Sequence, residues 1–320
     1  MALNYDALTA LTQKKYIPKV IDNFYKSNPF LVYLKEKESK FPGGHKIVEP
    51  LIYGNISGVK SYSLYDTLTY DTNIPISAAE FEPKNVVAPI IISKDEELKN
   101  SGETQVLSML QSKIDIVEKT LKDSVTSMLY GDGTGNSGKD ITGLGAAISD
   151  SNTYGGIDRS TYTWWKAKIA TNNAAVPGTA ATLTLNNMMR TFLSISDGND
   201  QPDLLLCGLA TWHEYYKLLD AKAQVTTKMG QKMADYGFQT LEFMGKPIIA
   251  DPNCGEGIIY FLNSKYMKWR VHKDANFATT KFRPDDSRLA KKQEILLTAN
   301  LTINNSRRFA KLVDITYTAL

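Results

Sequence analysis

The feature of this sequence that most constrains its fold is a long amphipathic helix predicted from Glu103 to Tyr130. Its apolar residues recur in steps of three and four, which places them on one stripe of a helix. These residues are Leu107, Leu110, Ile114, Val117, Leu121, Val125 and Met128. Such a helix spans roughly 40 Å at ~1.5 Å per residue, well beyond the ~11–12 residues of an average helix. We therefore expect it to act as a spine for the strands that precede it.

Composition sets the outer bounds for the rest of the chain. Its 320 residues with 42% hydrophobic content are enough for two or three domains with a real core. A net charge of +3 is too small to mark a dedicated nucleic-acid binder. Cys207 and Cys254 lie far apart without CxxC spacing, which favours reduced, buried thiols. No secretory signal and no run of ~20 apolar residues is visible, so we expect a soluble protein made in a reducing compartment.

The segment before Phe41 is polar and mixed in charge, with apolar anchors between. Tyr16, Val20 and Phe24 are i,i+4 neighbours, which predicts a short amphipathic helix that ends before Asn28-Pro29. Two interpretations remain open for this segment. It is either an ordinary N-terminal helix on its own core or an arm that packs on a neighbouring subunit.

The segment from Gly43 to Ser93 predicts a long, mostly two-stranded excursion. Residues Lys46 to Tyr53 and Val86 to Ile92 are rich in β-branched side chains and predict strands. Turn-forming residues and four prolines punctuate the segment, and proline in a strand indicates an edge. An isolated hairpin is marginal in water, and a long exposed edge invites pairing with another chain. We favour a projecting extension stabilised by a partner over one side of an ordinary sheet.

Two capping boxes are predicted from spacing. Ser93 and Glu96 open a short helix before the spine, and Asn100-Ser101-Gly102 separates the two helices. Thr211 and Glu214 open a second helix that runs to about Lys222.

The remainder of the chain, from Asp140 onward, alternates helices and strands without regular βαβ spacing. Thr184 is predicted to cap a helix that contains Met188 and Phe192. Strands are expected at Asp203–Cys207, Pro247–Ala250, Gly257–Leu262, Tyr266–His272, Glu294–Ile303 and Lys311–Thr316. This uneven order favours an α+β fold over a doubly wound sheet.

One tract imitates a nucleotide-binding loop. Gly133–Lys139 matches GxxxxGK, but Asp140 stands where Mg²⁺ binding needs Ser or Thr. The tract also follows a helix, whereas a phosphate loop leaves a strand and enters a helix. Residues 132, 134 and 136 begin like a calcium loop, yet the twelfth position is Gly143 instead of a bidentate Glu. We expect a flexible connector here.

The histidines offer no alternative chemistry. His45, His213 and His272 have no metal-ligand spacing such as HxxxH, and the sequence has no GxSxG elbow. His213-Glu214 lacks the second histidine of HExxH. We therefore expect no catalytic, cofactor-binding or metal-binding residue and no enzymatic activity.

Basic residues concentrate late in the chain. Between Lys265 and Asp314, twelve Lys or Arg stand against five acids. Such a surface suits non-specific contact with packaged nucleic acid, and it suits acidic patches on neighbouring subunits equally well.

The sequence contains several distinctive segments in this order: Val86–Leu98, Leu129–Thr134, Thr142-Gly143-Leu144, Tyr154–Arg159, Trp164-Trp165 and Gly245–Ile249. Together they resemble the major capsid protein of tailed bacteriophages, whose fold herpesvirus capsid floors and encapsulins share. The resemblance covers essentially the whole chain.

The resemblance implies four parts. Residues 1–42 would be an N-terminal arm and 43–92 an extended β-hairpin loop that overlaps the adjacent subunit. Residues 93–182 and 263–308 would form a peripheral domain with the spine helix 103–130. Residues 183–262 and 309–320 would form an axial domain at the five- and sixfold axes. Some relatives cross-link through a Lys and an Asn, but no motif supports this chemistry for Lys60.

The same resemblance implies partners and a location. The subunit would assemble with itself into the hexamers and pentamers of an icosahedral head around double-stranded DNA. Because the chain starts at the arm, a separate scaffolding protein is expected, with a portal and, optionally, a decoration protein. Assembly would take place in the host cytoplasm, without a membrane, to give a virion. An encapsulin-like cargo compartment and a nucleotide-dependent enzyme built on Gly133–Lys139 are the alternatives.

Overall fold

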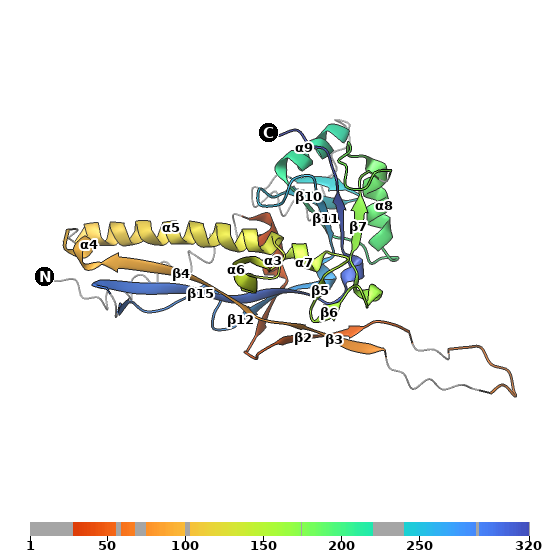
Figure 1. The fold of residues 1–320 in the computed structure, drawn as a ribbon, viewed down its shortest axis with the longest axis horizontal. Coiled ribbons are helices and arrows are strands. Elements are labelled where there is room, and N and C mark those ends of the chain that lie inside the picture. The colour runs from red at the N-terminus through yellow and green to blue at the C-terminus, as the bar shows by residue number, and fades with distance from the viewer. Residues whose placement is uncertain are drawn as a thin grey trace.

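The structure of the protein, a computed structural model, describes residues 28–55, 59–67, 75–99, 103–173, 175–219, 240–285 and 288–319. It is an elongated α+β molecule, with two six-stranded sheets and a projecting hairpin (Figure 1). Within the described residues, no helix is long and apolar enough to cross a bilayer. The predicted α+β class is confirmed. The helix predicted over residues 16–25 lies outside the described residues.

The first sheet is long and narrow, and a single strand runs through most of it. Its strands are β1 (Glu38–Phe41), β4 (Lys84–Ser93), β12 (Met267–His272), β13 (Ala278–Thr279), β14 (Arg283–Pro284) and β15 (Ala290–Ile303). β15 pairs with β4 in antiparallel fashion from Ala290↔Ser93 to Ala299↔Lys84. Its last residues, from Ala299 to Ile303, pair with β12, also antiparallel. β1 pairs with β12 in parallel. The 14-residue strand β15 is therefore the axis of this sheet.

The spine helix forms where it was predicted. Helix α5 (Glu103–Tyr130) lies along the β4–β15 ribbon in Figure 1. Ile114, Leu121 and Val125 of the predicted stripe are buried. On β4, alternation buries Ile90 and Ile92 toward the helix. Burying apolar surface at ~25 cal/mol per Å² makes this contact the main support of the helix.

The predicted capping box between β4 and the short helix α4 (Lys94–Lys99) is confirmed. Ser93 N donates to Glu96 Oε2 at 3.0 Å, and Glu96 N donates to Ser93 Oγ at 3.2 Å. Both orphan donors are satisfied reciprocally. The predicted break at residues 100–102 lies outside the described residues.

The second sheet has strand order β7-β16-β11-β8-β10-β9. Its strands are β7 (Lys168–Thr171), β8 (Leu204–Cys207), β9 (Thr240–Phe243), β10 (Lys246–Ala250), β11 (Ile259–Leu262) and β16 (Ala310–Val313). Helices α8 (Leu185–Ile195) and α9 (Leu209–Leu218) pack against it. The predicted Thr184 cap is confirmed, since Thr184 Oγ1 accepts from Asn187 N at 3.3 Å. β7 pairs with β16, so residues 168–171, expected beside the spine, belong to this second sheet.

Short elements fill the region between the spine and the second sheet. They are α6 (Gly135–Gly138), α7 (Leu144–Ala147), β5 (Thr153–Tyr154), β6 (Ile157–Asp158) and the 3₁₀ turns η1 (Thr163–Trp165), η2 (Ser264–Tyr266) and η3 (Ser306–Arg308). Their packing depends on Arg159, which is fully buried. Its guanidinium donates to the carbonyls of Ala146, Ala147 and Trp165 at 2.6, 2.6 and 3.1 Å. Burial lowers the pKa of Arg159 to about 10, so it stays charged at neutral pH.

The expected long hairpin over residues 43–92 is wrong in its pairing. β2 (Ile47–Ile52) pairs with β3 (Ile76–Phe81), and together they form the projecting hairpin. β4, expected as its second strand, pairs with β15 instead. The reason is burial, because alternate residues of β4 need the cover that α5 gives them, and an isolated hairpin offers none.

Two helix boundaries also differ from prediction. Asn28-Pro29, expected only to end a helix, begins α3 (Pro29–Glu36): Asn28 Oδ1 accepts from Phe30 N and Leu31 N at 3.0 and 3.2 Å. Proline at the first helical position needs no N–H partner, so the pair is a start signal.

At α9, the expected Thr211–Glu214 capping box does not form. The helix begins earlier, at Leu209, and ends at Leu218 rather than Lys222. The distant Glu256 carboxylate caps it, accepting from Ala210 N at 3.1 Å and Thr211 N at 2.9 Å. A carboxylate supplied from another loop satisfies the same donors as a local cap.

Two apolar clusters hold the molecule together. One fills the space between α8, α9 and the far face of the second sheet. The other lies between the first sheet, α5 and the near face of the second sheet. Successive residues of β8 therefore enter different clusters. Leu204 and Leu206 belong to the cluster beside α5, and Leu205 and Cys207 to the cluster beneath α8 and α9. The end of the spine enters the shared cluster, where Tyr130 OH donates to Asp251 Oδ2 at 2.7 Å.

Candidate assembly interface

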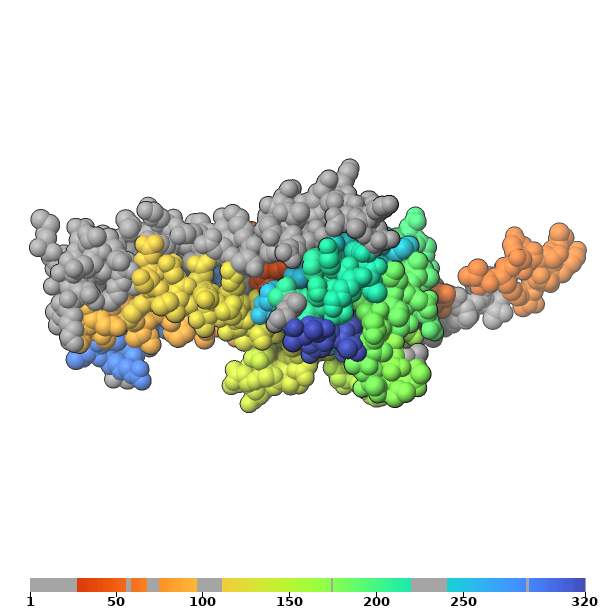
Figure 2. Space-filling view, turned by 90° about the horizontal axis from the view of Figure 1, so that it is seen from above, coloured from red at the N-terminus to blue at the C-terminus, as the bar shows by residue number. Residues whose placement is uncertain are grey.

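The extended loop presents apolar side chains that its own chain does not cover. It comprises the β2–β3 hairpin and the described residues between the two strands, and it stands clear of the body (Figure 1; Figure 2). Val59, Tyr62, Leu64 and Tyr65 are 94%, 73%, 86% and 95% exposed. Apolar surface exposed to water does not stabilise an isolated chain, and exposed apolar patches mark interaction sites.

The tip of the extended loop is a turn with its own hydrogen bonds. Ser63 N donates to Asp66 Oδ2 at 2.8 Å, and Asp66 N donates to Ser63 O at 3.0 Å. Leu64 and Tyr65 occupy the two central positions of this turn. Lys60 Nζ donates to Thr67 O at 2.6 Å, so this lysine closes the base of the turn.

A buried carboxylate fixes the base of the hairpin to the first sheet. Glu49 of β2 is 2% exposed. Arg270 donates to Glu49 Oε1 from Nε at 2.8 Å and also from Nη2. Lys268 Nζ lies 3.2 Å from Glu49 Oε2, and Thr302 Oγ1 donates to Glu49 Oε1 at 3.3 Å. A buried charge with this many donors is satisfied only in one pose, so the hairpin leaves the body in a fixed direction.

Aromatic contacts also hold the base of this hairpin. Phe81 meets Tyr154 edge-on, with ring centroids 5.1 Å apart, and Glu80 N donates to Gly155 O at 2.9 Å. Tyr53 stacks on Trp164 at 5.2 Å. The Trp164-Trp165 pair singled out in the sequence therefore supports the root of the extended loop.

Further exposed apolar side chains lie on β4 and beside the start of β15 in the first sheet. Val87 and Ile91 of β4 are 57% and 41% exposed, and Leu289 beside the start of β15 is 87% exposed. Leu289 also lines a pocket of about 330 Å³ with Ile92 and Pro284. The end of β4 and the start of β15 lie at the opposite end of the molecule from the β2–β3 hairpin (Figure 1).

The outer edge of β4 is partly closed against strand addition. Pro89 has no N–H to offer, and Lys113 Nζ from the spine donates to Ile91 O at 2.9 Å. Lys113 also pairs with Glu96 at 2.8 Å, and this ammonium lowers the pKa of the Glu96 carboxyl. Proline and lysine at an edge are devices that prevent unwanted pairing. Side-chain packing on the sheet face is therefore the favoured mode of contact.

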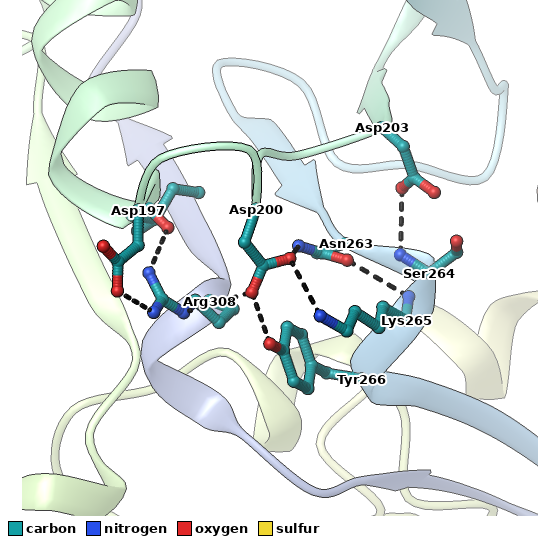
Figure 3. Close-up of polar contacts among 9 residues, drawn as sticks. Asp197, Asp200, Asp203, Asn263, Ser264, Lys265, Tyr266 and Arg308 are labelled. Atoms are coloured by element: carbon teal, nitrogen blue, oxygen red, sulfur yellow. Dashed lines mark hydrogen bonds and ion pairs between the residues drawn. The ribbon is translucent and has the colours of Figure 1, made fainter.

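A polar cluster lies where the two sheets join (Figure 3). Asp200, in the turn after α8, accepts hydrogen bonds from Tyr266 OH and from Asn263 Nδ2, the latter at 3.1 Å. Arg308 donates to Asp197 Oδ2 at 2.5 Å, and its Nε lies 3.7 Å from Asp200 Oδ2.

The electrostatics of this cluster favour an ionised Asp200. Partial burial raises the pKa of the Asp200 carboxyl, but hydrogen bonds from Tyr266 and Asn263, with the charges of Lys265 and Arg308, outweigh it and lower the pKa. Burial and the same carboxylate raise the pKa of the Tyr266 phenol, which remains a donor. None of these groups was singled out as a pair in the sequence, because they are up to 111 residues apart.

Several backbone amides in and next to the glycine tract are already hydrogen-bonded within this segment. Gly138 N, Lys139 N and Asp140 N donate to the carbonyls of Thr134, Asn136 and Gly135. Lys84 Nζ donates to Gly138 O at 2.8 Å. The tract follows α5, as the sequence indicated, and these hydrogen bonds form a turn within the connector. The helix α7 that begins after Gly143 was not predicted.

The histidines and cysteines form no reactive group. His45 is exposed, His213 stacks on Tyr216 at 6.4 Å, and His272 meets Phe41 edge-on at 5.3 Å. Cys207 and Cys254 are buried free thiols, as expected. Among the described residues, no three acidic, histidine or cysteine side chains gather as metal ligands.

At least six of the twelve late basic residues have acidic partners within the chain. They are Lys265, Lys268, Arg270, Arg283, Lys292 and Arg308. Their partners are Asp197, Asp200, Glu49, Glu294 and Asp285. Internal ion pairs therefore take up part of the basic excess counted from the sequence.

Sequence reasoning missed the Glu49 anchor, although one signal was present. Ile47, Glu49 and Leu51 alternate on one face of β2, and a carboxylate on the buried face of a strand needs a cationic partner. What the sequence does not give is the identity of that partner, more than 200 residues away on β12.

Solved structures with similar folds are phage capsids and an encapsulin. The capsid of cyanophage A-1(L) is 19% identical, with a TM-score of 0.70 over 91% of this chain and 94% of that chain. The capsid of a native GTA particle is 13% identical, with a TM-score of 0.59 over 88% and 90%. A Synechococcus elongatus encapsulin complex is 11% identical, with a TM-score of 0.54 over 91% and 90%. No protein-family description and no curated protein matches the sequence. The chain thus has the capsid shell fold that the sequence predicted.

Replacing Glu49 tests the hairpin anchor. We expect Glu49→Gln to destabilise the protein by about 3 kcal/mol, because it leaves the Arg270 charge without its buried partner. Urea unfolding measures this loss, and hydrogen exchange in residues 47–52 reports the loosened hairpin. The control is Glu80→Gln, which breaks an exposed pair with Lys46 and should cost far less, because water screens that pair. Equal losses in the two variants would refute the anchor.

The pH dependence of stability tests the charge state of Asp200. Because its pKa is lowered from 3.8 on folding, the stabilisation is present above that value and is lost as pH falls below it. The difference in unfolding free energy between the wild type and Asp200→Asn should therefore be constant above about pH 5 and shrink below about pH 4. Denaturant titrations from pH 7 to pH 3 measure it. A difference that persists unchanged at pH 3 contradicts the expectation.

Proposed function

We propose that this chain is the major capsid protein of a tailed bacteriophage, which assembles into an icosahedral head around double-stranded DNA. The observation that carries the proposal is the extended loop, with an uncovered apolar tip and a base fixed by buried Glu49. A rigid arm that carries exposed apolar side chains gains free energy only against a neighbour. The capsid shell fold supports the same function.

In this proposal each part has a role in assembly. Residues 1–42 act as the N-terminal arm, 43–92 as the extended loop, 93–182 with 263–308 as the peripheral domain, and 183–262 with 309–320 as the axial domain. The pairing described above moves residues 84–92 and 168–171 across these predicted boundaries. Hexamers and pentamers of the chain form the shell in the host cytoplasm, and the product is the virion. A scaffolding protein, a portal and optionally a decoration protein act with it.

The two exposed apolar surfaces suggest how neighbours meet. The tip of the extended loop and the pocket lined by Leu289 lie at opposite ends of an elongated chain. Contact between the tip of one subunit and the pocket of the next is heterologous, and repetition of such a contact closes a ring when the rotation between neighbours divides a full turn. Obligate interfaces of this kind bury ~2,000–5,000 Å², so the loop supplies one part of a larger contact.

An encapsulin-like compartment is the second candidate, because an encapsulin shares the fold. The two functions differ in what the shell encloses. Non-specific contact with DNA would use the basic residues that have no acidic partner described above, such as the exposed Lys273 and Arg307. Sequence features of phage type and the late basic excess favour the head of a phage.

Charged substitutions at the loop tip test the assembly role. We expect Leu64→Asp combined with Tyr65→Asp to abolish closed shells while the subunit stays folded, because these side chains are almost fully exposed in the single chain. Negative-stain electron microscopy and size-exclusion chromatography measure assembly, and circular dichroism checks the fold. Val176→Asp, at another exposed apolar position, is the control and should assemble normally. Normal shells from the double variant would overturn the proposed role of the loop.

The contents of purified shells separate the two candidates. We expect particles from the native host to hold nuclease-protected double-stranded DNA and no stoichiometric enzyme. Gel electrophoresis after nuclease treatment and mass spectrometry of the shell contents decide this. A single abundant cargo protein without DNA would favour the compartment instead.

A further inference from the structure

Two strands run from one sheet into the other as a single antiparallel ribbon. β11 pairs with β16 in the second sheet, as far as Phe261↔Ala310. Their continuations β12 and β15 pair in the first sheet, from Met267↔Ile303. The same two chain segments therefore stay side by side across the junction between the sheets.

The ladder of this ribbon is interrupted at the junction. Between the pairs Phe261↔Ala310 and Met267↔Ile303, five residues of one strand (262–266) lie opposite six residues of the other (304–309). Each side folds into a 3₁₀ turn, η2 and η3. One backbone bond described across the gap is Asn304 N to Tyr266 O at 3.1 Å. A one-residue mismatch of this kind bends a ribbon, and a place without ladder bonds is where it can flex.

Side chains from a third segment replace the missing ladder. The turn Asp197–Asp200 is itself held by two backbone bonds, Asp197 N to Asp200 O and Asp200 N to Asp197 O, both 2.9 Å. Asp200 contacts both sides of the ribbon, through Asn263 and Tyr266 on one side and Arg308 on the other (Figure 3).

Further contacts extend this arrangement. Asp203 Oδ1 accepts from Ser264 N at 2.9 Å and from Tyr33 OH of α3 at 2.8 Å. Arg308 Nη1 donates to Ile195 O, at the end of α8, at 3.3 Å. Elements from both sheets therefore meet at one bend, although the apolar cluster alone would already hold the sheets in contact.

We propose that the Asp197–Asp200 turn is a clamp that fixes the bend of this ribbon, and with it the angle between the two sheets. The apolar contact between the sheets is non-directional, whereas the clamp's hydrogen bonds require one geometry. The consequence for assembly rests on the proposed function: a shell of uniform curvature needs subunits with one angle, and a loosened clamp gives shells of variable size.

The clamp is tested in the full-length, unassembled chain by a distance between the two sheets. Spin labels at Asp123→Cys on α5 and Arg190→Cys on α8 occupy exposed positions, while the native Cys207 and Cys254 are buried. Pulsed dipolar spectroscopy then gives the distribution of distances. Asp200→Ala should broaden this distribution, and hydrogen exchange at Ser264 and Asn304 should become about tenfold faster.

Two variants make the outcome specific. Asp132→Ala removes another turn-forming aspartate, bonded to Thr134, and should leave the distance distribution unchanged. Tyr266→Phe removes a single clamp bond and should broaden the distribution less, which keeps the test usable if Asp200→Ala does not fold. Distributions for Asp200→Ala and Tyr266→Phe that both match the control would overturn the clamp.

Shell geometry provides the second readout. In electron micrographs, Asp200→Ala or Tyr266→Phe should widen the distribution of shell diameters relative to Asp132→Ala. Broadened distances with unchanged diameters would overturn the link to curvature. If the wild-type chain formed no shells, the proposed function would fail, while the distance measurement would still decide whether the clamp exists.

Discussion

The burial of one continuous apolar cluster between the spine helix, the first sheet and the near face of the second sheet supports everything else in this protein. Residues from α5, β4 and β15 enter it from one side, and alternate residues of β8 and β11 enter it from the other. Because both sheets bury residues in this cluster, the two sheets stay in contact. In the proposed shell, subunits would also need one angle between the sheets, since small angular errors accumulate around a closed surface.

Polar groups add the directions that apolar contact does not supply. Glu49 beneath the hairpin, Arg159 among the short elements and Asp200 at the bend each collect several donors or acceptors from distant segments. Each joins elements whose relative orientation the hydrophobic effect leaves undetermined. Each is a charged side chain that is buried or partly buried, and a buried charge without its hydrogen-bond or ion-pair partners destabilises the fold. These three groups therefore orient the β2–β3 hairpin, the short elements between the spine and the second sheet, and the bend of the ribbon.

Prediction from the sequence succeeded for elements with strong local signals. The spine from Glu103 to Tyr130 and the Ser93–Glu96 box follow from periodicity and spacing alone. It failed where the partner is remote: β4 pairs with β15, which lies about 200 residues later, and Glu256 caps α9 from another loop. It also failed at Asn28-Pro29, where the same two residues end one predicted helix and begin another. A local sequence pattern therefore predicts whether a segment is a helix or a strand more reliably than it predicts which other elements that segment contacts.

The sequence by itself determined the class of the fold, the long helix, the exposed character of the extension and the lack of a reactive motif. These depend on side-chain periodicity and composition, which are local properties. Tertiary structure alone decided which strand completes the hairpin, which cations neutralise Glu49, and which of the late basic residues, Arg270 and Arg283 among them, are paired. It also decided that Asp200 meets both sides of the ribbon. Contacts of this kind join residues far apart in the chain, and their energies depend on burial, which no single segment encodes.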